Sequence, residues 1–449
     1  MRSLCTPYVR PHYFSQSRKS TIHTMNNKFL LQSRLVGMNF LEFAVWGAYL
    51  TSMGNYLGSV GLGDYTFWFY AVQGIVSIFM PGLMGIVADK WVPAERLLGL
   101  CHFLAALFMA SAGYYGMTTP EPDFVTIFSL YTLSVAFFMP TIALSNSVAF
   151  TGLTQANMDT VKDFPPIRVF GTVGFICSMW ATDLLGFKST YEQFYSSAFL
   201  GFILAAYAPT LPKCPINKEG GKKTIAQALG LDAFKLFKQK RMAIFFIFSM
   251  LLGVSLQITN SYATPFISSF AVDEVYKETF GVQHSVILYS LSQISEACCI
   301  LLIPFFLRRY GIKRVMMMAM AAWIFRFGLF GFGNPGPGVW MFILSMIVYG
   351  LAFDFFNISG ALFVDQNTDG NIRNSAQGLF MIMTNGLGAS LGMMAAGAIV
   401  NHFTTWEQFG SDKFQVGNWS AVWLIFATYA LIVFVLFTIF FKEQRSATK

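Results

Sequence analysis

The chain has 449 residues, of which 55% are hydrophobic, 17% are aromatic and only 12% are charged. A soluble domain carries about 25% charged residues, so this composition excludes an ordinary soluble enzyme or binding module. The net charge of +8 does not indicate a nucleic-acid partner, because lysine and arginine also set membrane topology. The cysteines form no CxxC pair, so we expect no metal site, and we expect no cofactor.

The first element in chain order is a hydrophilic leader, residues 1–34. Its first 24 residues contain no acidic side chain and no apolar core, which excludes a secretory signal. Their Arg, Ser and Thr content weakly resembles a mitochondrial transit peptide. The simpler interpretation is a cytosolic tail that precedes a natural start at Met25.

The rest of the chain is organised by long apolar segments. A spanning helix needs about 20 mostly apolar residues. Twelve segments qualify, at 35–58, 66–88, 97–118, 124–149, 167–186, 194–212, 243–271, 284–306, 315–333, 339–364, 375–401 and 419–441. We therefore expect an all-α polytopic membrane protein with twelve transmembrane helices.

The loops predict the orientation of these helices. Acidic residues dominate after odd-numbered segments, as at Asp183 and Glu407, whereas basic residues dominate on the other side, as at Arg96 and Arg314. Since lysine and arginine mark the cytoplasmic face, both termini are expected inside. A basic linker at 213–242 separates two six-helix halves at 35–212 and 243–441, and a cytosolic tail follows at 442–449. We interpret the linker as lying against anionic lipid.

Polar residues inside the apolar segments come in pairs spaced by three or four residues, which places each pair on one helix face. The pairs are Asn39 with Glu42, Arg168 with Thr172, Gln257 with Asn260, Gln293 with Glu296, and Asp354 with Asn357. A charge at membrane depth is costly and usually serves function. Each pair alone could simply join neighbouring helices, but together they predict one central hydrated pocket.

The chemistry of this set favours a neutral, polar and partly aromatic solute. Amides offer both donors and acceptors to a base edge, and carboxylates accept hydrogen bonds from sugar hydroxyls. Phe175 and Phe353 are placed to stack on a planar ring. We expect protons to be carried by Asp354 first, Glu296 second and Glu42 third.

Three other polar residues are expected to have lesser roles. Arg326 at membrane depth is predicted to have structural partners, and His102 is predicted to lie at the membrane interface. Asn385 lies in a Gly-rich run, TNGLGASLG, which indicates close helix packing.

Two resemblances support these expectations. The two halves and the turn GIVADK resemble the major facilitator superfamily. The runs KDFPPIRVFGTVGFI, LQITN, LSQISE, LSMIVYGLAFDFFNISG and SAQGLFMIMTNGLG resemble its nucleoside/proton symporter family over nearly the whole chain. The resemblance implies a substrate site formed by Arg168, Thr172, Phe175, Gln257, Asn260, Gln293, Glu296, Phe353 and Asp354. One residue departs from the expected pattern, because related permeases are expected to carry a neutral Gln where Glu42 stands.

The leading hypothesis is a proton-coupled nucleoside symporter of the bacterial inner membrane that works as a monomer by alternating access. The alternative within transport is another neutral polar solute, such as a sugar or a free nucleobase. A membrane enzyme would need a nucleophile with a base, or a metal cluster, and the sequence suggests neither. A channel is the remaining hypothesis.

Overall fold

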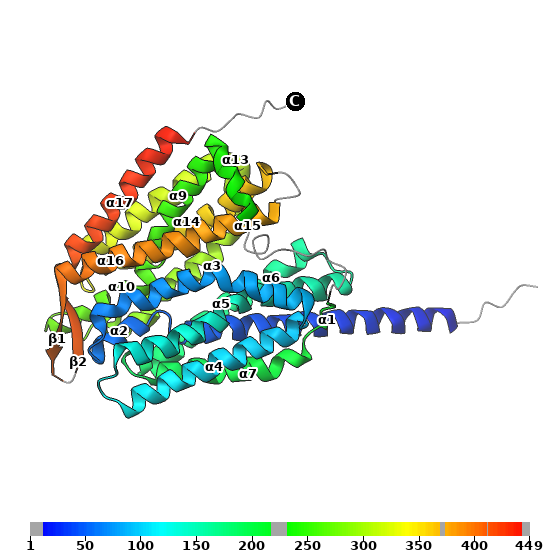
Figure 1. Ribbon diagram of the computed structural model, residues 1–449, viewed down its shortest axis with the longest axis horizontal. Helices are drawn as coiled ribbons and strands as arrows, with labels where there is room; N and C mark the ends of the chain where they lie inside the picture. The colour runs from blue at the N-terminus through cyan, green and yellow to red at the C-terminus, as the bar shows by residue number, and fades with distance from the viewer. Residues whose placement is uncertain (1–11, 217–230, 369–372, 411, 442–449) are drawn as a thin grey trace, which may run out of the picture.

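The computed structural model describes residues 12–216, 231–368, 373–410 and 412–441, and it is mostly helical. Figure 1 shows the helices in two groups, which we call the first group (α1 to α7) and the second group (α9 to α17). Residues 217–230 of the predicted basic linker, and the predicted tail at 442–449, lie outside the described residues.

The first group is built from long apolar helices. α1 begins at His12, well before the start expected at residue 35, and it ends at Gly47. The other elements are α2 (Met53–Ser59), η1 (Gly63–Tyr65), α3 (Thr66–Lys90), α4 (Ala94–Thr118), α5 (Phe124–Gln155), α6 (Thr160–Leu184), η2 (Phe187–Ser189), α7 (Glu192–Tyr207) and η3 (Ala208–Thr210).

The second group contains a larger number of short elements. These are η4 (Leu231–Lys238), α9 (Lys240–Leu256), α10 (Ile258–Ser269), η5 (Phe270–Val272), α11 (Phe280–Gln283), α12 (Ser285–Tyr289), α13 (Leu291–Phe332), α14 (Val339–Gln366), α15 (Arg373–Met381), the π-helical η6 (Ile382–Gly388), α16 (Ala389–Phe403) and α17 (Trp419–Phe440). α13 contains a kink at Gly311, whose φ of 77° is not helical. A residue without a Cβ adopts this left-handed conformation at little cost.

Eight helical stretches within the described residues are long and apolar enough to cross a membrane. One of them, Ser285–Phe332, has 48 residues and includes the kink at Gly311. Their exposed large hydrophobic side chains, such as Leu301 and Phe325, suit lipid better than water.

Several predicted segments are interrupted rather than continuous. Segment 35–58 breaks between α1 and α2, and segment 243–271 breaks at Gln257. Segment 284–306 breaks at Ser290, and segment 375–401 passes through η6. Breaks in membrane helices expose backbone groups, which are tolerated where protein buries them or where they line a cavity. The helix breaks are therefore positions where a polar binding site could form.

α1 and α6 pack with their backbones nearly in contact. A Cβ added to Gly47 would lie 2.4 Å from the carbonyl oxygen of Phe175, and one added to Gly174 would lie 2.1 Å from that of Phe40. Small residues permit this approach, which fixes the position of α6 and its polar side chains.

A two-stranded hairpin joins α16 to α17, although the sequence analysis predicted only helices. β1 (Thr404–Phe409) pairs antiparallel with β2 (Asp412–Gly417). The strands contain several β-branched and aromatic residues (Thr404, Thr405, Trp406, Phe409, Phe414 and Val416), and these residues, together with the positive φ of Gly410, favour this structure locally. The ring of Trp406 packs against Gly58 and Gly63 of the first group, where an added Cβ would approach it to 2.0 Å.

The hydrogen bonds that join the two groups, within the described part of the chain, gather toward one end. We call this end, defined by Thr51, Asp183, Ser290 and Trp406, the closed end. Trp180 Nε1 donates to Ser290 Oγ at 2.8 Å, and the Thr264 hydroxyl donates to the Thr51 carbonyl.

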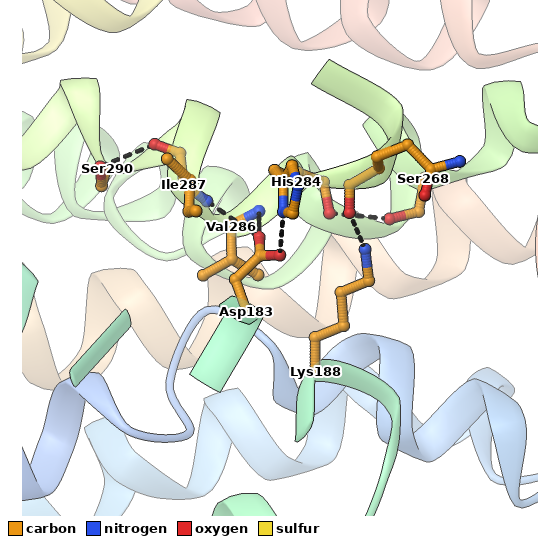
Figure 2. Close-up of polar contacts among 9 residues, drawn as sticks. Asp183, Lys188, Ser268, His284, Val286, Ile287 and Ser290 are labelled. Carbon is orange, nitrogen blue, oxygen red and sulfur yellow. Dashed lines mark hydrogen bonds and ion pairs between the residues drawn. The ribbon is translucent and has the colours of Figure 1, made fainter. Parts of the chain in front are cut away.

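Asp183 makes three contacts with the second group at the closed end (Figure 2). Its Oδ2 accepts from the backbone nitrogens of Val286 (2.9 Å) and Ile287 (3.1 Å), and its Oδ1 lies 3.0 Å from His284 Nδ1. Lys188 donates to the carbonyl of Gln283 nearby, and burial lowers the pKa of this lysine. One carboxylate from α6 thus satisfies the amino end of α12.

Candidate functional site

Three of the predicted residues, Arg168, Thr172 and Phe175, lie on α6. The Arg168 guanidinium stacks on the Phe43 ring, 3.8 Å from its centroid. Its N–H groups donate to no acceptor among the described residues. Thr172 and Phe175 are buried, one and two turns further along, and Phe175 meets Trp46 edge to face at 6.2 Å.

Two carboxylates of the second group lie within electrostatic range of this arginine. The guanidinium of Arg168 interacts electrostatically with Glu296 on α13 and Asp354 on α14, and also with Glu42 in its own group. No ion pair shorter than 4 Å joins them in the described part of the chain. Asp354 is 6% exposed, and its Oδ2 is buried without a hydrogen-bond partner in the described structure. This oxygen is available to a proton or to a hydroxyl group.

The amides of Gln257 and Asn260 lie at the break between α9 and α10. Asn260 Nδ2 donates to Gln257 Oε1 at 3.0 Å, and the Tyr289 hydroxyl donates to Asn260 Oδ1, also at 3.0 Å. The two amides at this break are therefore joined by a hydrogen bond. Sequence periodicity had placed these residues on one face, but it gave no indication of Tyr289.

Gln293 and Phe353 complete the predicted set. Gln293 is 7% exposed on α13, one turn before Glu296. Phe353 on α14 stacks on Tyr349, with ring centroids 5.6 Å apart. Tyr349 was missed by sequence reasoning, although its position one turn before Phe353 on the same helix is a signal that could have found it.

Glu42 lies in a different environment from the other carboxylates. Its side chain is completely buried inside the first group, where Oε1 accepts from Thr141 Oγ1 at 2.6 Å and Oε2 lies 2.8 Å from His102 Nε2. His102 is completely buried inside the first group, and the prediction that it lies at the depth of the membrane interface stays a prediction. Asn39 donates to the Leu35 carbonyl of its own helix instead of to another predicted site residue.

Arg326 and Asn385 behave as the sequence suggested. Arg326 is completely buried and donates to Ser292, Tyr289 and the carbonyl of Ser345, which confirms that it has structural partners. The Gly-rich run near Asn385 packs closely, since a Cβ on Gly388 would lie 2.4 Å from the Met250 carbonyl.

The arrangement combines groups whose chemistry suits a polar, partly aromatic molecule. Amides and carboxyl oxygens offer directional hydrogen bonds, one guanidinium offers donors, and buried phenyl rings offer flat apolar faces. The groups come from both helix groups, and two of them, Gln257 and Asn260, lie at the helix break between α9 and α10. Eight long apolar helical stretches in two groups, with polar and charged side chains at membrane depth, are typical of an integral membrane transporter.

The comparisons with known proteins identify the family. Residues 29–446 match the model of the nucleoside H+ symporter family, and the chain belongs to it. This confirms the family predicted from the sequence. The xanthosine permease of Escherichia coli is 46% identical over 425 residues, covering 93% of this chain and 97% of the relative. The nucleoside permease NupG of Escherichia coli is 46% identical over 426 residues, covering 92% and 97%.

Solved structures agree with this assignment. The crystal structure of the nucleoside transporter NupG matches with a TM-score of 0.81 at 45% identity, covering 92% of this chain and 100% of that one. A D-xylose-proton symporter matches with a TM-score of 0.66 at 13% identity, covering 94% and 100%. The second match shows the major facilitator fold alone.

Proposed function

We propose that this protein is a proton-coupled symporter that imports nucleosides by alternating access. The observation that carries the proposal is a pair of polar groups without hydrogen-bond partners in the described structure, the Arg168 guanidinium in the first group and the buried Asp354 Oδ2 in the second. A site divided between two rigid groups is exposed or closed when the groups rock about it. The membership in the nucleoside H+ symporter family supports the substrate class.

The proposed architecture has twelve spans in two six-helix halves, 35–212 and 243–441. This number follows from the eight apolar stretches when Ser285–Phe332 is counted as two spans divided at Gly311. Three further spans are then added: α1 together with α2, α6, and α7. The linker at 213–242 and both terminal segments, 1–34 and 442–449, then lie in the cytoplasm of a bacterium, with the halves in its inner membrane. The protein is proposed to work as a monomer.

The proposed substrate site consists of the residues that line the boundary between the groups. Phe175 and Phe353 contact the base, and the amides of Gln257, Asn260 and Gln293 bind polar atoms of the nucleoside. Arg168 and Thr172 donate from α6, while the carboxyl groups of Glu296 and Asp354 accept from hydroxyls. Support comes from the unpartnered guanidinium and the unpartnered carboxyl oxygen described above.

Proton coupling is assigned to Asp354, with Glu296 second and Glu42 third. A charge on Asp354 is costly in its buried position unless Arg168 compensates it. A proton on Asp354 removes that cost when the two groups separate. Glu42 is a separate buried carboxyl group with its own partners, so it would act without direct contact with this pair.

The closed end corresponds to the outer face of the membrane in the proposed orientation, since Asp183 and Glu407 belong to the acidic loops. The hydrogen bonds between groups gather at this end, which supports an inward-facing state. Release of these bonds is the step that would admit a nucleoside from outside.

The test is uptake of a nucleoside panel into proteoliposomes, with and without an imposed pH gradient. We expect accumulation above the equilibrium level only with the gradient acid outside. Competition by ribose or by uracil as effectively as by uridine would instead assign the carrier to a sugar or a nucleobase. Uptake that equilibrates but never accumulates would contradict proton coupling and indicate a channel or an uncoupled carrier.

A further inference from the structure

Arg326 is the starting point of a hydrogen-bond chain that ends at the amides of the proposed substrate site. It lies on α13 with no exposed surface, and no carboxylate lies within 4 Å of it in the described part of the protein. Its Nη2 donates to the Tyr289 hydroxyl at 3.3 Å. The Tyr289 hydroxyl donates to Asn260, and Asn260 donates to Gln257, each at 3.0 Å.

The direction of this chain follows from the chemistry of arginine. A guanidinium has donors only and accepts no hydrogen bond, so the phenol oxygen of Tyr289 must accept from it. The hydroxyl hydrogen then points to the nearer acceptor, Asn260 Oδ1, rather than to Thr259 Oγ1 at 3.3 Å. With its oxygen occupied, Asn260 turns its nitrogen to Gln257 Oε1.

The last member of the chain therefore presents a defined group. Gln257 is half-buried, its Oε1 accepts from Asn260, and its Nε2 donates to no described residue. An isolated glutamine could present either its oxygen or its nitrogen to a ligand. This one is held with the nitrogen free.

Arg326 also supports the aromatic side of the site. Its guanidinium carbon lies 4.3 Å from the Tyr349 ring centroid, and Tyr349 stacks on Phe353. Nη1 is held by the Ser345 carbonyl at 2.9 Å and faces Ser292 Oγ at 3.3 Å. Ser345, Ser292 and Tyr289 thus hold the arginine in place. Two of its contacts, Tyr289 and Tyr349, in turn contact the proposed site residues Asn260 and Phe353.

We infer that Arg326 is a positioning residue that sets the polarity of the substrate site. Through Tyr289 and Asn260 it makes Gln257 a hydrogen-bond donor, so this side of the site selects nucleosides with an acceptor, such as a base carbonyl oxygen. The inference rests on the proposed function and deepens it, because it names which edge of the base is recognised. Uridine and cytidine differ in this property, with a carbonyl oxygen in one where the other has an amino group.

Equilibrium binding of uridine and cytidine to the purified, folded transporter tests the inference. Tyr289→Phe breaks the chain while it keeps the ring. We expect the affinity for uridine to fall about tenfold, which corresponds to one unpaired polar contact. We also expect the ratio of uridine affinity to cytidine affinity to fall toward one. Tyr262→Phe is the matched control, because Tyr262 is equally buried and its hydroxyl has no described partner.

Two variants of Arg326 separate positioning from a purely structural role. Arg326→Lys keeps a cation that can only donate hydrogen bonds, so it should retain the wild-type ratio of uridine to cytidine affinity. Arg326→Gln introduces a side chain that can also accept a hydrogen bond, so it should lower this ratio toward one. A Tyr289→Phe protein with an unchanged ratio overturns the inference, as do Lys and Gln variants with the same ratio. A wild-type protein that binds neither nucleoside contradicts the proposed function itself.

Discussion

Glu42 Oε2 and His102 Nε2 lie 2.8 Å apart, and both side chains are completely buried. Thr141 donates to the other carboxyl oxygen, and His102 Nδ1 has no partner among the described residues. Glu42→Ala leaves the buried His102 ring without a partner, whereas Thr141 keeps the Phe138 carbonyl as an acceptor, so we expect the change to lower the free energy of unfolding by about 3–5 kcal/mol. Denaturation of the detergent-solubilised protein measures this loss.

Glu42→Gln separates structure from coupling at the same position. An amide keeps the shape and the hydrogen bonds but cannot exchange a proton, so the variant should fold. We expect fewer protons to move with each nucleoside, which is measured as a shift in the reversal potential. An unshifted reversal potential removes Glu42 from proton coupling.

Asp354→Asn is expected to abolish accumulation driven by a pH gradient. The buried carboxyl oxygen has no described partner, and an amide in its place cannot load and release a proton. Counterflow exchange should survive, because it needs binding and rocking but no net proton movement. Undiminished gradient-driven accumulation would transfer the coupling role to Glu296.

Gln257→Ala, Asn260→Ala and Gln293→Ala should each weaken nucleoside binding by about 1–3 kcal/mol. Each truncation leaves a polar group of the bound nucleoside unpaired at a buried position. Calorimetry with uridine measures the effect, and the yield of monodisperse protein controls for folding. Normal uridine binding by all three variants would show that the substrate binds elsewhere.

Asp183→Ala is expected to weaken the closed end. The change removes three contacts with the second group, including two backbone donors at the start of α12. We expect a larger outward-open population, measured by spin-label distances across the closed end. Asp273→Ala is the control, because Asp273 is an exposed acid of the same predicted face whose side chain contacts only its own loop. An equal shift in both variants would contradict the prediction.

Gly47→Ala should destabilise the protein by about 1–3 kcal/mol, the usual effect of overpacking. The added carbon would lie 2.4 Å from the Phe175 carbonyl, so α1 and α6 must separate. Gly328→Ala is the matched control, since a carbon there would meet nothing within 4 Å. Equal unfolding temperatures for the two variants would contradict the close packing of α1 and α6.

The apolar segments and the polar pairs could be predicted from the sequence because both depend on local spacing. A run of about 20 apolar residues has few structures available in a membrane, and residues three or four apart share a face. The electrostatic interaction of Arg168 with Glu296 and Asp354 is consistent with packing of these polar faces near one another.

The helix breaks and the Glu42–His102 pair could not be predicted in the same way. A helix interrupted at Gln257 keeps nearly the same apolar pattern as a continuous one, so periodicity does not reveal the break. Glu42 and His102 are sixty positions apart, and their contact depends on how α1 packs against α4. The hairpin at 404–417 was missed because its strands are short.

The closed end contains polar atoms that it does not satisfy. Thr51 Oγ1 and Trp406 Nε1 are both buried there without a partner in the described structure, and each such group costs about 1–3 kcal/mol. Separation of the two groups would let water hydrate both atoms while it exposes the apolar surface around them. Hydration of the two atoms thus offsets part of the free energy that separation costs. A nucleoside and a proton then shift the two populations by the difference in their affinity for the closed and open states.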